Sequence, residues 1–497
     1  MKKNRKSGIL MPVASLPGQY GIGTFGKEAY EFVDMLALAG QSYWQILPLG
    51  PTSYGDSPYQ SFSTFAGNPY FIDPVILIEK GLLTKKEADS YDFGTKPDRI
   101  DYEKIYNNRF KMLKKAFGRF DADKAKGYKT FVKNNAFWLD DYALFMAIKD
   151  SMGGISYLEW DEKIRRRDKK TVDIYKKKMS AEIDFYKFVQ YEFLTQWRAL
   201  RKYANDRGIK IIGDIPIYVA LDSADTWANP RLFRFDETGY PTAVAGCPPD
   251  AFTADGQLWG NPLYDWDYHK STGYKWWIAR IRHCFELYDT VRVDHFRAFD
   301  AYYSIPYEDE TARYGKWVKG PGYSLFKAIN DELGDIDVIA EDLGFITQSV
   351  VNLVRRCKYS GMKVLQFAFD SRSDSDYLPH NYTSDSVVYT GTHDNDTTVA
   401  WYKTIKAADR KKALAYMDRT ELTTGREISR AFVKLAMSTV SKLCIIPMQD
   451  WLALGTEARI NYPSTLGNNW VWRMKKGAFS QRLAREIRSI TKLYARM

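Results

Sequence analysis

The chain has 497 residues, enough to bury a large core, and 45% hydrophobic and 27% charged residues indicate a globular protein. Its formal net charge is +11, yet no nucleic-acid-binding motif accompanies the basic residues, which mix with acids as on solvated helix faces. No stretch approaches the roughly 18 apolar residues that cross a membrane. The basic and apolar N-terminus is too short for a secretory signal and is interrupted by Pro12. The four scattered cysteines suit a reducing compartment, so we expect a cytoplasmic protein without nucleic-acid or membrane partners.

The first motif along the chain is a glycine pattern, Gly21, Gly23 and Gly26, ahead of a helical run. A dinucleotide site would need a strand that runs straight into the first glycine and an acid about 20 residues later. Here "SLPGQY" follows the strand candidate "ILMPVA", and the next candidate, "SYWQILPLG", has no acid at its end. The pattern therefore predicts a tight loop that leads into a helix, where glycine supplies unusual backbone angles.

Eight short apolar runs recur along the chain and end in polar residues or glycine. Continuous apolar runs are typical of buried parallel strands. Helical periodicity precedes most of them, as in residues 181–208, which end at Gly208, a residue type that commonly caps helices. Strands that alternate with helices predict an α/β protein with a (β/α)₈ barrel. In chain order the runs are "GILMPVA", "YWQILPLG", "KIIGDIPIYV", "TVRVDHF", "DVIAEDLG", "KVLQFAFD", "SVVYTGTHDND" and "LCIIPMQDW".

The uneven spacing of these runs predicts long insertions within a single catalytic barrel that spans residues 1–497. Residues of about 70–180 are charged and helical in pattern, so we expect a helical subdomain there. Residues of about 228–266 are rich in glycine, proline and aromatic residues and should form an ordered loop at the mouth of the barrel. The tail after "NNWVWR" is short and helix-like, which leaves no room for a separate C-terminal β-sandwich.

Four carboxylates fall at the ends of these runs, namely Asp214, Asp294, Glu341 and Asp394. Catalytic residues of such barrels lie at the C-terminal ends of the strands, and buried charges need partners. Arg292 precedes Asp294 by two residues, so both side chains should leave the same face of the strand, and the guanidinium should hold Asp294 ionised. A carboxylate cluster for catalysis is one interpretation, and a purely structural ion-pair network is the other.

Carboxylates without a metal-ligand pattern favour glycoside chemistry, in which one carboxylate attacks the sugar and a protonated one assists the leaving group. The five histidines do not reproduce a two-histidine zinc helix, so we expect no metal. His295 directly follows Asp294 and should point the other way and pack. His393 stands beside Asp394 at a strand end, where substrate hydrogen bonding is favoured over metal ligation.

The strand-end segments "RVDHFR", "AEDLG" and "GTHDN" resemble those of the amylomaltases, the 4-α-glucanotransferases of the wider α-amylase superfamily. Longer segments, "LPLGPTSYGDSPYQSFSTFAGNPYFID", "GCPPDAFTADGQLWGNPLYDW" and "ARINYPSTLGNNWVWR", are also similar to family segments, so the resemblance covers essentially the entire chain. The segment "SLPGQYGIGTFG" resembles a family loop as well, which assigns the glycines to a barrel turn.

This resemblance implies that malto-oligosaccharides and α-1,4-glucans are the substrates and that no cofactor is needed. It implies Asp294 as nucleophile, Glu341 as general acid and base, and Asp394 as transition-state stabiliser. The substrate-binding residues would be Arg292, His393, Asp214, Tyr59, Trp259, Ser57, Gln257, Asn461 and, in a secondary glucan contact, Tyr54. One departure is Cys247 in "GCPPD", where the family pattern leads us to expect valine.

Two alternatives remain open from the residues alone. A retaining α-glucan hydrolase would use the same carboxylates, and a glucan-binding barrel without catalysis would keep only the fold. The aromatic loop that ends at Trp259 favours transfer, because its closure would exclude water. A retaining reaction also predicts about 5–5.5 Å between the carboxyl groups of Asp294 and Glu341. The oligomeric state is left open.

Overall fold

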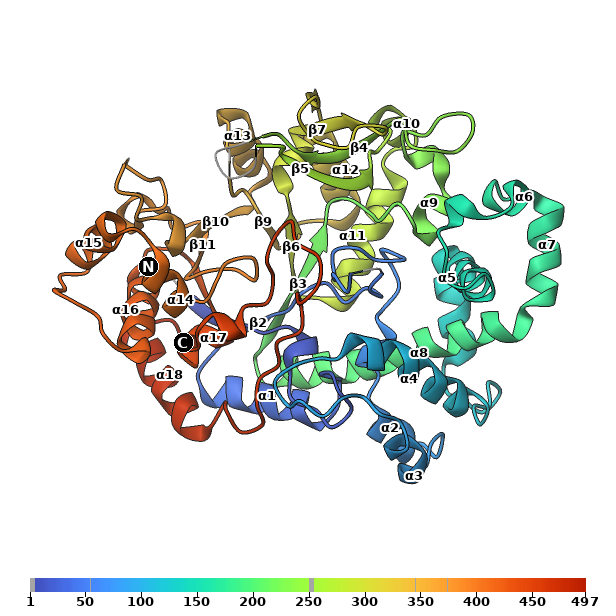
Figure 1. Ribbon diagram of the computed structural model, residues 1–497, viewed down its shortest axis with the longest axis horizontal. Helices are drawn as coiled ribbons and strands as arrows, with labels where there is room; N and C mark the ends of the chain where they lie inside the picture. The colour runs from blue at the N-terminus through green and yellow to red at the C-terminus, as the bar shows by residue number, and fades with distance from the viewer. Residues whose placement is uncertain (1–4, 54, 250–253, 345, 373) are drawn as a thin grey trace.

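A closed barrel of eight parallel strands forms the centre of the computed structural model, which describes residues 5–53, 55–249, 254–344, 346–372 and 374–497 (Figure 1). The strands follow one another around the barrel in the order β1-β12-β11-β10-β9-β6-β3-β2. Each of the eight predicted runs contains or adjoins one of these strands, so the barrel prediction is confirmed. Their bounds are β1 Lys6–Leu10, β2 Tyr43–Gln45, β3 Lys210–Pro216, β6 Thr290–Asp294, β9 Val338–Ala340, β10 Ser360–Val364, β11 Ser386–Tyr389 and β12 Leu443–Pro447.

Helices surround the barrel and connect its strands (Figure 1). The prediction for residues 181–208 is confirmed by α8 (Ser180–Asp206), and Gly208 just beyond it has a φ of 74°. Buried Trp197 of α8 donates its indole N–H to the carbonyl of Leu287 at the end of α11 (Lys275–Leu287), at 3.0 Å, which fixes α8 against α11. The other connecting helices are α1 Lys27–Leu38, α9 Ala224–Ala228, α10 Trp266–Ser271, α12 Tyr323–Leu333, α13 Gln348–Cys357, α14 Thr398–Thr404, α15 Ala407–Tyr416, α16 Gly425–Ser438, α17 Met448–Trp451 and α18 Gln481–Leu493.

Between β2 and α8 the chain forms a group of helices that lies to one side of the barrel (Figure 1). The longest of them, α5, packs along α8, and rings fill the contact, as where Tyr142 meets Tyr186 with centroids 6.2 Å apart. This packing anchors the group to a helix of the barrel. The bounds are α2 Pro74–Glu79, α3 Lys85–Asp89, α4 Tyr102–Phe117, α5 Tyr128–Ser151, α6 Glu162–Arg165 and α7 Lys169–Lys178.

A second, four-stranded antiparallel sheet stands apart from the barrel strands, in the order β5-β4-β7-β8. Its strands are β4 Ala243–Cys247, β5 Gln257–Pro262, β7 Ala301–Pro306 and β8 Lys316–Lys319. Residues 228–266 were expected to form a loop, but they contribute two of these strands, and two more come from beyond β6. The strands are short, and glycine or proline interrupts their alternation, which explains why the pattern did not predict them.

The glycine pattern near the N-terminus forms a loop, as predicted. Gly21 has a φ of 80°, and a Cβ at Gly23 would lie 1.8 Å from the carbonyl oxygen of Val13. Gly26 precedes α1, while β1 ends well before the loop, at Leu10. At the other end of the chain, the described residues after β12 form helices and irregular segments without a further strand. None of the described helices is both long and apolar enough to cross a membrane.

Candidate active site

Strands β3 and β6 bring an arginine between two carboxylates. Their register places Asp214 opposite Arg292. The buried Arg292 guanidinium donates to both carboxylate oxygens of Asp214, at 2.8 and 2.7 Å, and its other Nη lies 2.9 Å from Oδ1 of Asp294. Tyr59 donates its hydroxyl to Asp214 at 2.8 Å. The spacing of Arg292 and Asp294 therefore puts both side chains on one face, as predicted, and Asp214 is fully buried while the Asp294 side chain keeps 28% of its surface exposed.

Glu341 is held beside Asp294 by the backbone. Val293 pairs with Ala340 in the parallel register of β6 and β9, so the residues that follow them, Asp294 and Glu341, lie at the same level of the barrel. The N–H of His295 donates to one carboxylate oxygen of Glu341 at 2.8 Å, and the N–H of Leu343 donates to the other at 2.7 Å. Two main-chain donors thus fix the orientation of this carboxyl group.

Burial and neighbouring charges give the carboxyl groups of Glu341 and Asp294 different pKa values. Burial, followed by the negative charge of Asp294, raises the pKa of Glu341 to about 7, although Arg292 and the two N–H donors oppose the rise. Burial also raises the pKa of Asp294 to about 6, helped by Asp214 and opposed by Arg292. Arg292 lowers the pKa of Asp294, as a guanidinium that favours the ionised carboxylate should, but burial has the larger effect and leaves the pKa above its ordinary value. Glu341 nonetheless holds a proton more readily than Asp294, as an acid–nucleophile pair requires.

The loop after β11 carries His393 and Asp394. The buried imidazole of His393 stacks on the ring of Tyr59 with centroids 5.2 Å apart, and its Nε2 lies 3.4 Å from Oδ2 of Asp394. Asn461 donates its amide N–H to Oδ1 of Asp394 at 2.6 Å, and 44% of the Asp394 side chain stays exposed. Tyr59 therefore joins the Asp214–Arg292–Asp294 cluster to Asp394.

Trp259 and Gln257 lie on β5 of the small sheet. The indole N–H of Trp259 donates to the side chain of Gln257 at 3.0 Å, and the Trp259 ring meets His295 edge to face at 4.8 Å. His295 packs, as predicted, although its partner is a predicted substrate-binding ring. Cys247 on β4 pairs with Gln257 in the register of this sheet, so the departure from the family pattern adjoins a predicted substrate contact.

Two predicted substrate-binding residues, Ser57 and Tyr54, remain. Ser57 is turned toward its own loop, where its hydroxyl accepts the backbone N–H of Tyr59 at 3.3 Å. Tyr54 lies outside the described residues. Throughout the described ranges, no three His, Cys, Asp or Glu side chains gather closely enough to hold a metal ion.

Two residues that our sequence analysis did not select complete the surroundings. Buried Asp450 accepts hydrogen bonds from the hydroxyls of Thr390 and Thr398 and from the N–H of Thr398, so it ties both ends of the His393–Asp394 loop to α17, directly after β12. The ring of Trp470 lies 5.9 Å from that of Tyr59 and contacts His393 as well. Asp450 stands one residue before the end of the last predicted run, so the strand-end rule applied to the other four carboxylates would have identified it.

Comparison with known sequences and structures gives a consistent picture. The sequence family described as 4-alpha-glucanotransferase matches residues 11–479. The 4-alpha-glucanotransferase of Clostridium butyricum is 49% identical over 98% of this chain and all of its own length, and that of Thermus thermophilus is 45% identical over the full length of both. The structure is similar to that of the amylomaltase from Streptococcus agalactiae in complex with acarbose, with a TM-score of 0.96, 42% identity and 99% coverage of both chains.

Proposed function

Since the chain belongs to the 4-alpha-glucanotransferase family, we propose that Asp294 and Glu341 carry out its double displacement on malto-oligosaccharides. Asp294 attacks the anomeric carbon while protonated Glu341 gives its proton to the departing glycosidic oxygen. The glycosyl–Asp294 ester then reacts with the hydroxyl of an acceptor sugar, whose proton returns to Glu341. Two inversions at one carbon retain the α configuration.

The observation that carries this assignment is the electrostatic asymmetry of the pair. The Arg292 guanidinium lies 2.9 Å from Oδ1 of Asp294 and favours its ionised form, while burial and the charge of Asp294 raise the pKa of Glu341 to about 7. A general acid works best with a pKa near the working pH. Asp394, exposed and held by Asn461, is proposed to stabilise the positive charge that develops on the sugar ring.

The proposed substrate contacts are the aromatic and polar groups around this pair. Trp259 lies beside the segment that follows Asp294, through its contact with His295. A ring in that place suits an acceptor sugar, and Tyr59 and His393 suit the donor side because they join Asp214 and Arg292 to Asp394. A relative is described in complex with acarbose, which supports malto-oligosaccharides as the substrate class.

Incubation with maltotriose tests the function. Glucose together with a ladder of longer oligosaccharides is the expected result. Glucose and maltose alone would show a hydrolase, and unchanged maltotriose would show a binding protein. The matched control, Asp294→Asn, changes one atom of the nucleophile and should give no products while its circular dichroism stays that of the parent enzyme.

We further propose that the enzyme acts in the cytoplasm. Cys284, Cys357 and Cys444 are buried free thiols, which suits a reducing compartment. Fractionation of the cells that produce it, with antibody detection, would test this.

A further inference from the structure

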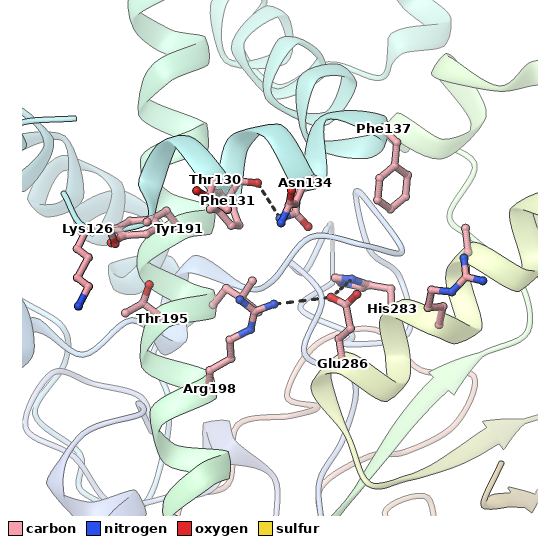
Figure 2. A pocket seen from close by; sticks show the side chains of 15 residues that line it. Lys126, Thr130, Phe131, Asn134, Phe137, Tyr191, Thr195, Arg198, His283 and Glu286 are labelled. Atoms are coloured by element: carbon pink, nitrogen blue, oxygen red, sulfur yellow. Dashed lines mark hydrogen bonds and ion pairs between the residues drawn. The ribbon is translucent and has the colours of Figure 1, made fainter. Parts of the chain in front are cut away.

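An open pocket of about 720 Å³ lies between α5, α8 and α11, and its lining includes none of the carboxylates described above (Figure 2). Its volume falls within the range of about 300–1,000 Å³ that is usual for small-molecule sites. Side chains from all three helices surround the same opening in Figure 2, with Asn134 and Phe137 on α5, Arg198 on α8 and Glu286 on α11. Three helices therefore form a pocket that has no part in the proposed catalytic mechanism.

One wall of the pocket is a polar and aromatic face of α5. Thr130, Asn134 and Phe137 line the pocket at helical spacing, so their side chains share one face. Phe137 leaves 61% of its surface exposed and is supported by an edge-to-face contact with Phe65 at 5.4 Å. An accessible ring beside an amide and a hydroxyl can stack on the apolar face of a pyranose and hydrogen-bond its hydroxyls.

Two of the arginines that line the pocket are paired with carboxylates. Arg198 lies 3.7 Å from Glu286, whose other neighbour is Nδ1 of His283, also at 3.7 Å. Arg282 is paired outside the pocket with Glu332 at 2.6 Å. Lys126 also lines the pocket, at the opposite end of the opening from Phe137 (Figure 2). Because Arg198 and Arg282 are each paired with a carboxylate, a single lysine does not make the converging positive charge that a phosphate or another anion needs. The pocket offers paired donors and acceptors, which suit a neutral ligand with many hydroxyl groups.

The floor of the pocket is joined to the segment that carries Tyr59. Nε2 of His283 lies 2.9 Å from the carbonyl oxygen of Phe65, and Phe65 follows Tyr59 by six residues between β2 and α2. His283, which lines the pocket, therefore contacts the segment whose other end reaches Asp214 in the active site.

We propose that this pocket is an accessory site for a stretch of α-1,4-glucan, an inference that rests on the glucan specificity of the proposed function. Long chains would be held by the pocket and the active site together, whereas maltotriose would use the active site alone. Holding a chain at two sites raises its effective concentration at the second without any new contact there.

Electrophoresis in native gels that contain soluble amylose tests the proposal. Phe137→Ala and Asn134→Ala should each weaken retardation by amylose about three- to tenfold, the range expected for loss of a stacked ring. Their kcat/KM with maltotriose should stay within about twofold of the parent. Tyr106→Ala, which removes a 65% exposed ring on α4 outside the pocket, is the matched control and should change neither quantity. Unchanged retardation of both pocket variants would overturn the proposal.

A crystal of Asp294→Asn soaked in maltoheptaose gives a direct reading. Sugar density against Phe137 would support the accessory site, and an empty pocket beside an occupied active site would overturn it. Continued turnover by Asp294→Asn would instead contradict the proposed function. The gel measures amylose binding and does not depend on turnover, so the two failures can be told apart. Because Phe137 is 61% exposed, its replacement should leave the fold intact, which circular dichroism of both pocket variants would verify.

Discussion

The pH dependence of activity gives the sharpest test of the proposed carboxylate pair. The active form needs Asp294 ionised and Glu341 protonated, and their pKa values are raised to about 6 and about 7. One pKa unit corresponds to about 1.4 kcal/mol, and the direction of the difference places a single shared proton on Glu341 in preference to Asp294. Activity should fall below about pH 6 as Asp294 is protonated and above about pH 7 as Glu341 loses its proton.

The variant Asp214→Asn perturbs one side of this profile. The negative charge of Asp214 raises the pKa of Asp294, so its removal should move the acid limb to lower pH. The alkaline limb should move less, because burial and Asp294 itself are the main causes that raise the pKa of Glu341. Tyr59→Phe, which removes a hydrogen bond to Asp214 without changing a charge, is the control and should lower the rate while keeping both limbs.

The assay is the initial rate of glucose release from maltotriose well below KM, measured from pH 4 to pH 9, because kcat/KM reports the titration of the free enzyme. The two limbs belong to the pair as a whole. A profile without an alkaline limb, or an acid limb that moves to higher pH in Asp214→Asn, would refute the assignment of acid and nucleophile.

Three further outcomes are expected. Trp259→Ala should shift products from transfer toward hydrolysis, since a stacked ring contributes about 1 kcal/mol; an unchanged ratio of glucose to lengthened chains would remove Trp259 from the acceptor site. Glu341→Gln should accumulate a glycosyl-enzyme, seen by mass spectrometry, with α-maltosyl fluoride, whose leaving group needs little protonation; absence of the adduct would count against Glu341 as the acid and base. Asn461→Ala should lower kcat/KM for maltotriose about tenfold, because a hydrogen bond to a charged group contributes about 1.5 kcal/mol or more and this one measures 2.6 Å; a rate equal to that of the parent would show that Asp394 needs no such support.

The barrel could be predicted because its strands are buried on both faces, and their sequences are therefore continuous apolar runs. The strand-end rule then selected Asp214, Asp294 and Glu341, and a spacing of two residues placed Arg292 on the same face as Asp294. The pairing of Arg292 with Asp214 depends on the register of β3 against β6, whose residues are far apart in the sequence, so no local pattern contains it.

The parts that could not be predicted depend on loop conformation or on chain segments that meet only in the fold. The N–H groups that bind Glu341 belong to His295 and Leu343. Any residue type other than proline offers the same donor, so the residue types at these positions do not indicate the contact. The small sheet joins strands from both sides of β6, each too short to be recognised. The net pKa of Asp294 depends on how strongly burial competes with Arg292, a balance that appears only when the surrounding atoms are placed.

The two main-chain hydrogen bonds to Glu341 affect which amino-acid substitutions this enzyme tolerates. Both hydrogen bonds to its carboxylate come from the main chain, so substitutions of neighbouring side chains leave the donors in place. One point is sensitive, because His295 has a φ of 51°, a conformation that glycine and asparagine adopt easily and β-branched residues do not. Side chains around Glu341, the Trp259 ring among them, can therefore differ among variants, in nature or in directed evolution, while the path of the main chain keeps the Glu341 carboxylate in its orientation.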